Sequence, residues 1–196
     1  MSKANLLDRR AVVAELLKDR GGAIAVGGLG ASTYDIAAAG DHDRNFYLWG
    51  GMGGAVMIGL GLALAQPTLP VVVITGDGEM LMGMGSLATV GVQKPKNLSI
   101  LVLDNEAYGE TGGQASHTGA TADLVGVAKA CGIKDTRNIT TMAEVEAFAS
   151  SLQDLTAGPR FASAKIDGAN LERVLSSRDG TYIVNRIRGS LGHSPI

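Results

Sequence analysis

Asp77 and Asn105 are the side chains whose types and spacing best fit a metal-binding site. Asp77 is the centre of a Gly-Asp-Gly triplet that follows the apolar run 71–75, and Asn105 comes shortly after a second apolar run at 98–103. Such short runs are typical of buried parallel strands, and neighbouring parallel strands end at the same edge of a sheet. A carboxylate and an amide beside helix N-termini suit a Mg²⁺ ion that carries a phosphate group. The pair therefore predicts a site for magnesium and a diphosphate.

Three glycine-rich turns are expected to supply the rest of this site. They cover residues 28–32, 50–53 and 76–79. Diphosphate oxygens are bound by backbone N–H groups that must approach closely, and side chains beyond Cβ would obstruct that approach. We therefore expect the three turns to converge around the phosphate groups.

Alternating strands and helices must position these turns. The apolar periodicity predicts helices at 6–20, 34–39, 51–65, 79–91, 122–130 and 142–152, and strands at 23–26, 46–48, 71–75, 98–103 and 161–166. This alternation predicts a doubly wound α/β fold, in which a mainly parallel sheet carries helices on both faces. We expect one domain over residues 1–168. The tail, residues 169–196, is expected to pack partly on a partner subunit and to end in mobile residues.

The composition excludes several classes of protein. A formal charge of −2 and a pI near 5.9 argue against binding to nucleic acid or to acidic membranes, which require clustered positive charge. The single cysteine, Cys131, excludes a disulfide framework and an iron–sulfur cluster held by this chain alone. The longest apolar stretch, 55–65, is too short to span a membrane. Because the first residues show no apolar signal core, we expect a cytoplasmic protein.

The sequence around the metal motif resembles the thiamine diphosphate enzymes. In that family a Gly-Asp-Gly triplet is followed at roughly this spacing by Asn-Asn or Asp-Asn, which here is Asp104-Asn105. The segments 43–47, 83–89, 94–98 and 108–114 narrow the resemblance to sulfopyruvate decarboxylase β subunits and to the C-terminal half of phosphonopyruvate decarboxylases. The similarity covers about residues 4–168. It implies the diphosphate-binding (PP) module of the thiamine diphosphate-binding fold.

The resemblance also implies roles for individual residues. Mg²⁺ would be held by Asp77, Asn105 and the backbone carbonyl of Ala107. Met52 would support the cofactor in its bent shape and thus contribute to catalysis, although an ordinary core methionine is the alternative. His117 is a candidate proton donor to the substrate, or else a solvated loop residue. The remaining implied cofactor contacts are Gly30, Ala31, Ser32, Gly50, Gly76, Gly78, Glu79, Tyr108, Gly109, Glu110 and Thr111.

Glu79 departs from the family pattern, because many relatives carry a small hydroxyl residue there. A carboxylate beside a diphosphate is repelled, so we expect the Glu79 side chain to turn away and its N–H alone to bind.

The resemblance implies only half of an active site. In the family, a glutamate that activates the cofactor comes from a separate pyrimidine-binding domain, and nothing in this chain resembles that domain. We therefore expect a hetero-oligomer with an α subunit that supplies this domain, meeting this chain near Met52 and Tyr108. The implied reaction is the decarboxylation of a small 2-oxo acid, such as sulfopyruvate or phosphonopyruvate, to an aldehyde and CO₂.

Other functions fit parts of the sequence. The chain is also similar to carboligases of the acetolactate synthase type and to β subunits of 2-oxo acid oxidoreductases, although the latter usually carry iron–sulfur cysteines. A dinucleotide-binding protein is a weaker alternative, because Thr33 replaces the third glycine of the usual fingerprint. A regulatory subunit without activity is a further alternative.

Overall fold

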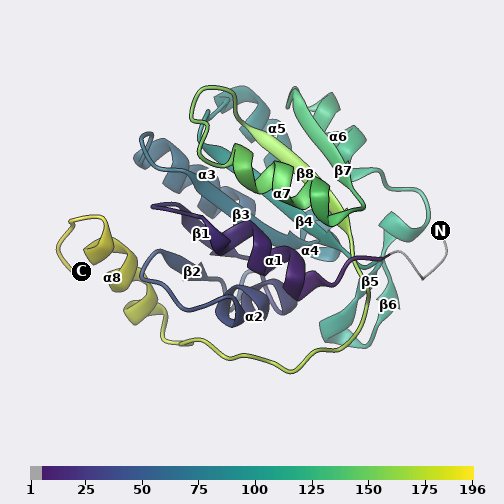
Figure 1. The fold of residues 1–196 in the computed structure, drawn as a ribbon, viewed down its shortest axis with the longest axis horizontal. Coiled ribbons are helices and arrows are strands. Elements are labelled where there is room, and N and C mark those ends of the chain that lie inside the picture. The colour runs from purple at the N-terminus through teal and green to yellow at the C-terminus, as the bar shows by residue number, and fades with distance from the viewer. Residues whose placement is uncertain (1–5) are drawn as a thin grey trace.

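A computed structural model describes residues 6–196, so the first five residues of the predicted domain lie outside the described part. Its main sheet has the strand order β2-β1-β3-β4-β8-β7, and every pairing is parallel (Figure 1). The strands are β1 (Ile24–Gly27), β2 (Asn45–Tyr47), β3 (Val71–Gly76), β4 (Leu98–Asp104), β7 (Asp135–Ile139) and β8 (Arg160–Lys165). The predicted parallel α/β sheet is confirmed.

The direction of winding reverses between β1 and β3. From β1 the chain moves outward to β2, whereas from β3 it moves the opposite way to β4. The turns that follow β1 and β3 therefore diverge at the carboxyl edge of the sheet. In open α/β sheets this switch point is where ligands bind.

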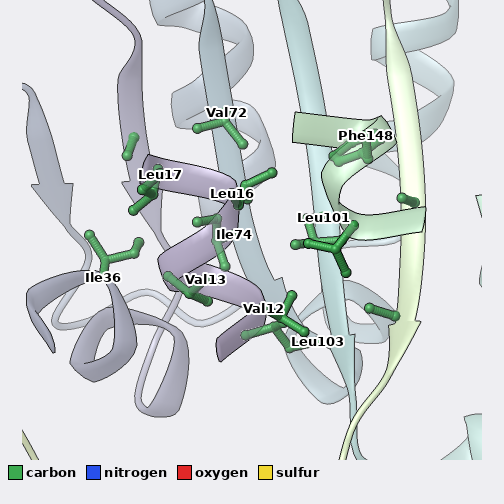
Figure 2. Close-up of a cluster of buried hydrophobic side chains, with 14 of the residues drawn as sticks. Val12, Val13, Leu16, Leu17, Ile36, Val72, Ile74, Leu101, Leu103 and Phe148 are labelled. Carbon is green, nitrogen blue, oxygen red and sulfur yellow. The ribbon is translucent and has the colours of Figure 1, made fainter. Parts of the chain in front are cut away.

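One face of the sheet is covered by α1 (Arg9–Lys18), α2 (Ala31–Ala38) and α7 (Met142–Ser151) (Figure 1). Val12 and Leu16 of α1 lie over the β3 and β4 side chains, with Phe148 of α7 beside them (Figure 2). All three side chains are at most 1% exposed. Burying each of them contributes about 1.5–3 kcal/mol to folding, so this face anchors the sheet firmly.

The opposite face is covered by α3 (Ala55–Ala65), α5 (Ser86–Gln93) and α6 (Leu124–Ala130). Along β3, Val71 and Val73 join this second core, while Val72 and Ile74 join the first. This period of two is the signature of a strand buried on both sides. None of the helices in the described part of the chain has the length and apolar character needed to cross a membrane.

The helix expected at 34–39 begins earlier, at Ala31, and two other predicted helices are interrupted by glycines. The helix expected at 51–65 begins at Ala55, since Gly51 and Gly53 adopt φ of +72° and +90° and form a loop instead. The helix expected at 79–91 is split into α4 (Asp77–Met82) and α5 by the segment 83–85. Both breaks lie at the carboxyl edge, where they shape the turns around the switch point.

The structure also contains elements that were not expected. Between β4 and α6 lie a short hairpin of β5 (Ala107–Tyr108) and β6 (Gln114–Ala115) and two 3₁₀ turns, η2 (Gly109–Thr111) and η3 (His117–Gly119). The tail forms an extended arm, 167–179, and then α8 (Gly180–Ser190), which packs beside β2 of the same chain (Figure 1). The expected contact of the tail with a partner subunit stays a prediction.

A buried ion pair joins α1 to α2. Asp35 is fully buried and accepts hydrogen bonds from Arg9 Nη1 at 2.9 Å and from Arg10 Nε at 3.2 Å. Asp35→Asn is expected to lower the free energy of unfolding by about 3 kcal/mol, because it leaves the buried Arg9 guanidinium without an anion. Urea unfolding would measure this change. Asp19→Asn, at the exposed end of α1, should change it by less than about 0.5 kcal/mol, and equal losses in the two variants would contradict the prediction.

Candidate functional site

A cleft of about 310 Å³ opens at the switch point. Its walls come from the turns after β1, β3 and β4, from the loop before α3 and from the segment that follows β8. The predicted residues that line it are Ala31, Ser32, Met52, Gly76, Asp77, Gly78, Glu79, Asn105, Ala107, Tyr108, Gly109, Glu110 and Thr111. The structure thus brings together residues that lie up to 80 positions apart in the sequence.

Asp77 and Asn105 lie at neighbouring strand ends in this cleft. Gly76 of β3 pairs with Leu103 of β4, so the two side chains follow adjacent strands. Asp77 is 2% exposed, and its Oδ2 accepts hydrogen bonds from the hydroxyls of Ser116 and Thr118. Burial raises the pKa of the Asp77 carboxyl despite these hydrogen bonds, and the negative charge of Asp104 adds to the rise. A nearby cation would favour the charged form of this carboxyl.

Asp104 is balanced by a lysine on the next strand. Thr118 Oγ1 donates to Asp104 Oδ1 at 2.7 Å, and Lys165 Nζ lies 2.8 Å from Asp104 Oδ2 and 2.6 Å from Glu106 Oε1. Burial opposes the charge of Lys165, but the hydrogen bonds with both carboxylates outweigh it and raise the pKa of the amine. Lys165 is therefore shared between the Asp104 and Glu106 carboxylates.

The oxygen donors near Asp77 fit a hard cation. Asn105 Oδ1 accepts the N–H of Ala107 at 3.1 Å, which folds the chain so that Asn105 and Ala107 both line the cleft. One carboxylate, one amide and a backbone carbonyl match the partial oxygen set that Mg²⁺ completes with phosphate and water. No group of three His, Cys, Asp or Glu side chains suited to a metal occurs between residues 6 and 196. An ion here would complete its coordination with phosphate and water.

The turn after β1 has the backbone geometry expected of a phosphate-binding turn. Gly30 adopts φ of +76°, and a Cβ on it would lie 2.6 Å from Glu110 Cγ. Thr33 Oγ1 donates to the carbonyl of Gly28 at 2.7 Å and closes the turn. Ala31 and Ser32 follow in the first turn of α2, where N–H groups lack helical partners and favour anions.

Glu79 connects this turn to the loop that carries Met52. Its carboxylate accepts the N–H of Leu29 at 2.8 Å, the N–H of Gly53 at 3.2 Å and the hydroxyl of Thr75 at 2.9 Å. The side chain therefore points at the backbone of two glycine-rich turns. The expectation that Glu79 binds a diphosphate only through its backbone N–H stays a prediction.

Three predicted residues lie outside the cleft lining. Gly30 sits directly behind Glu110, and Gly50 is exposed with open space around it. His117 is exposed on η3, although its neighbours Ser116 and Thr118 reach Asp77. Its proposed contact with the substrate stays a prediction.

The sequence reasoning missed several residues of the cleft. These are Arg9, Tyr34, Leu103, Ile166, Asp167, Gly168, Ala169, Asn170, Leu171 and Arg173, whereas Leu29 belongs to the predicted turn at 28–32. Arg173 comes from the arm after β8, lies over the ring of Tyr34 and forms an ion pair with Glu110 at 3.2 Å. The arginine content of the arm is the feature of the sequence that could have indicated a role in the site. The path of the arm could not be predicted, because its sequence has no strand or helix pattern.

The fold and the site define a class of protein: a doubly wound α/β domain that offers an oxygen-lined cleft and glycine-rich turns at its switch point. The family described as "Thiamine pyrophosphate enzyme, C-terminal TPP binding domain" matches residues 26–163. The chain belongs to this family. Membership excludes the alternative of a dinucleotide-binding protein using the turn at 28–30.

Similarities to individual proteins are more specific than the family match. The chain is 45% identical over 123 residues to sulfopyruvate decarboxylase subunit beta from Methanocaldococcus jannaschii, covering 63% of this chain and 64% of that protein. It is 41% identical over 162 residues to phosphonopyruvate decarboxylase from Streptomyces viridochromogenes, covering 82% of this chain and 39% of that protein. The chain therefore matches less than two thirds of the length of either relative.

Solved structures agree on the fold. A putative thiamin diphosphate-dependent enzyme from Mycobacterium smegmatis aligns with a TM-score of 0.71 at 21% identity, over 84% of this chain and 32% of that one. Benzoylformate decarboxylase from Polynucleobacter necessarius aligns with a TM-score of 0.66. Both similarities support the predicted thiamine diphosphate-binding fold.

Proposed function

We propose that this chain is the β subunit of a thiamine diphosphate- and Mg²⁺-dependent decarboxylase that acts on sulfopyruvate or phosphonopyruvate. The observation that carries the proposal is the cleft in which Asp77 and Asn105 follow adjacent strands beside the turns of the family. The similarity to decarboxylases named for these two substrates supports the substrate class. Sulfopyruvate and phosphonopyruvate are both small 2-oxo acids with a second anionic group.

The chain would hold its cofactor through the diphosphate. Asp77, Asn105 and the carbonyl of Ala107 would bind Mg²⁺, and the N–H groups near Ser32 and Gly78 would bind phosphate oxygens. The donor types fit, because Mg²⁺ takes few protein oxygens and shares the phosphate as a ligand. Backbone N–H groups add hydrogen bonds to the phosphate without adding bulk.

The same residues would orient the reactive part of the cofactor. When bound, thiamine diphosphate supplies a nucleophilic carbon that adds to the oxo acid and accepts the electrons released as CO₂ departs. Met52 lines the cleft and would support the cofactor. Tyr108 lies so close to the turn after β3 that a Cβ on Gly78 would come within 2.5 Å of its ring. These contacts would exclude water and fix the orientation.

The proposal includes a partner subunit. Relatives of this chain are named as beta subunits, which implies a second subunit in those enzymes. We propose that an α subunit contributes the activating glutamate and meets this chain near Met52 and Tyr108. Neither subunit would then catalyse the reaction alone.

Purification of the native assembly through a tag on this chain tests the proposal. The assembly, supplied with Mg²⁺ and thiamine diphosphate, is expected to release CO₂ and an aldehyde from sulfopyruvate or phosphonopyruvate faster than from pyruvate. Chelation of the metal should stop the reaction, and Mg²⁺ should restore it. Full activity from this chain alone would contradict the shared active site, and a complex without decarboxylase activity would contradict the proposed function.

A further inference from the structure

Glu79 is a buried carboxyl group whose hydrogen-bond partners are all uncharged. It is 4% exposed and forms no ion pair with any residue in 6–196. Burying a charge is costly unless hydrogen bonds replace its hydration. A carboxylate in this position therefore has a specific set of partners that compensates the cost.

Those partners come from two separate turns and from strand β3. Oε2 accepts the N–H of Leu29 after β1 and the hydroxyl of Thr75 at the end of β3, at 2.8 and 2.9 Å. Oε1 accepts the N–H of Gly53, one residue after Met52, at 3.2 Å. Hydrogen bonds from a backbone N–H to an ionised carboxylate are stronger than those between neutral groups. One side chain thus connects the turn after β1 to the loop before α3.

The neighbouring backbone is adapted to this carboxylate. A Cβ on Gly28 would lie 2.0 Å from Glu79 Oε2, so the turn can approach the carboxylate only because residue 28 has no side chain. The pairing of β1 with β2 extends to the hydrogen bond from the Leu48 N–H to the Gly27 carbonyl, and the loop at 50–54 beyond it contains two glycines with positive φ. The bonds to Glu79 therefore add a direct connection between the turn after β1 and the Met52 loop.

We propose that Glu79 is a positioning residue that holds the phosphate-binding turn at 28–32 and the Met52 loop at a fixed separation through their backbone amides. The amides of Leu29 and Gly53 are used by Glu79 in this arrangement, which leaves those of residues 30–32 for the cofactor. The expected effect of Glu79 on cofactor binding rests on the proposed thiamine diphosphate site. The expected effect on the two amides does not depend on that site.

Glu79→Gln tests the proposal with almost no change in shape. A carboxamide keeps one acceptor oxygen and presents an NH₂ group to the second donor, so one of the two amide connections must be lost. We expect faster hydrogen exchange at Leu29 or Gly53 in the full chain, while the amides of β3 and β4 keep their protection. The emission of Trp49, the single tryptophan of the chain, should also shift, because it precedes the Met52 loop.

The affinity for the cofactor is the second measurement. In the native assembly, thiamine diphosphate with Mg²⁺ is expected to bind about tenfold more weakly to the Glu79→Gln variant than to the original protein. Glu146→Gln makes the same change on the exposed face of α7 and should leave the affinity and exchange unaltered. Gly28→Ala should displace the carboxylate, so its effect should not add to that of Glu79→Gln.

The outcomes separate the two proposals. Unchanged exchange at both amides in Glu79→Gln, or additive effects of Gly28→Ala and Glu79→Gln, would overturn the role of Glu79. A native assembly that fails to bind thiamine diphosphate would overturn the proposed function, whereas the exchange measurement on the same chain would still decide whether Glu79 holds the two turns.

Discussion

Asp77→Asn is expected to weaken Mg²⁺ binding in the assembly by more than about 100-fold, since loss of an outer-shell partner alone costs 10–100-fold. The carboxylate is the one charged side chain in the proposed ligand set, and an amide cannot supply its negative charge. Thiamine diphosphate binding should fall in parallel, because the proposed ion would connect the diphosphate to the protein. Titration calorimetry with Mg²⁺ and with the cofactor would measure both losses.

The thermal stability of Asp77→Asn should not fall together with its affinity for Mg²⁺ and cofactor. Asp77 is buried, and burial raises its pKa, so its charge is unfavourable in the folded chain without an ion. Asp77→Asn is therefore expected to keep or raise the thermal unfolding temperature while cofactor binding is lost. Asp43→Asn, an exposed carboxylate after α2, serves as the control and should leave cofactor affinity unchanged. Equal cofactor affinity in Asp77→Asn and the control would contradict the metal site.

Gly83→Ala is expected to lower kcat/KM of the assembly by about 100-fold, the usual result of a displacement of about 1 Å near a reacting centre. A Cβ on Gly83 would lie 2.2 Å from the carbonyl oxygen of Gly53, which is backbone and cannot rotate away. The loop that carries Met52 must therefore shift. The unfolding free energy should fall by about 1–3 kcal/mol, as for other overpacked sites.

Gly85→Ala is a matched control for that variant. Gly85 lies in the same break between α4 and α5, has φ of −58°, and a Cβ on it would have no neighbour within 4 Å. This substitution should preserve activity and raise stability by about 0.4–1 kcal/mol through the unfolded chain. If both variants lose activity equally, the flexibility of the break rather than the Gly53 contact controls the site.

The central strands could be predicted closely from the sequence. The expected strands at 71–75 and 98–103 differ from β3 and β4 by one residue at their carboxyl ends. Runs of mainly apolar residues identify such strands because both of their faces are buried. The site residues predicted from Gly76 to Glu79 and from Asn105 to Thr111 lie at the ends of these strands, so the part of the cleft that they line was predicted with them.

The edges of the fold could not be predicted in the same way. β7 has the sequence Asp-Thr-Arg-Asn-Ile, and most of its side chains are partly exposed, so it lacks an apolar pattern. The contact of Ser116 with Asp77 joins residues that lie 39 positions apart, through a loop with no periodicity. Arg173 reaches the cleft on an arm without regular structure. Each of these three features depends on tertiary contacts, which leave no pattern in the local sequence.

Helix α8 has a consequence for how this chain can assemble. Arg186 Nη2 donates to the carbonyl of Asn45 in β2 at 3.1 Å, and the Arg186 guanidinium lies over the rings of Tyr47 and Tyr182. An outermost strand with unpaired backbone groups invites another chain to extend the sheet, and covering it prevents that. The β2 side is thereby closed to strand addition, so any association there must use side-chain surfaces rather than a continuous intermolecular ladder.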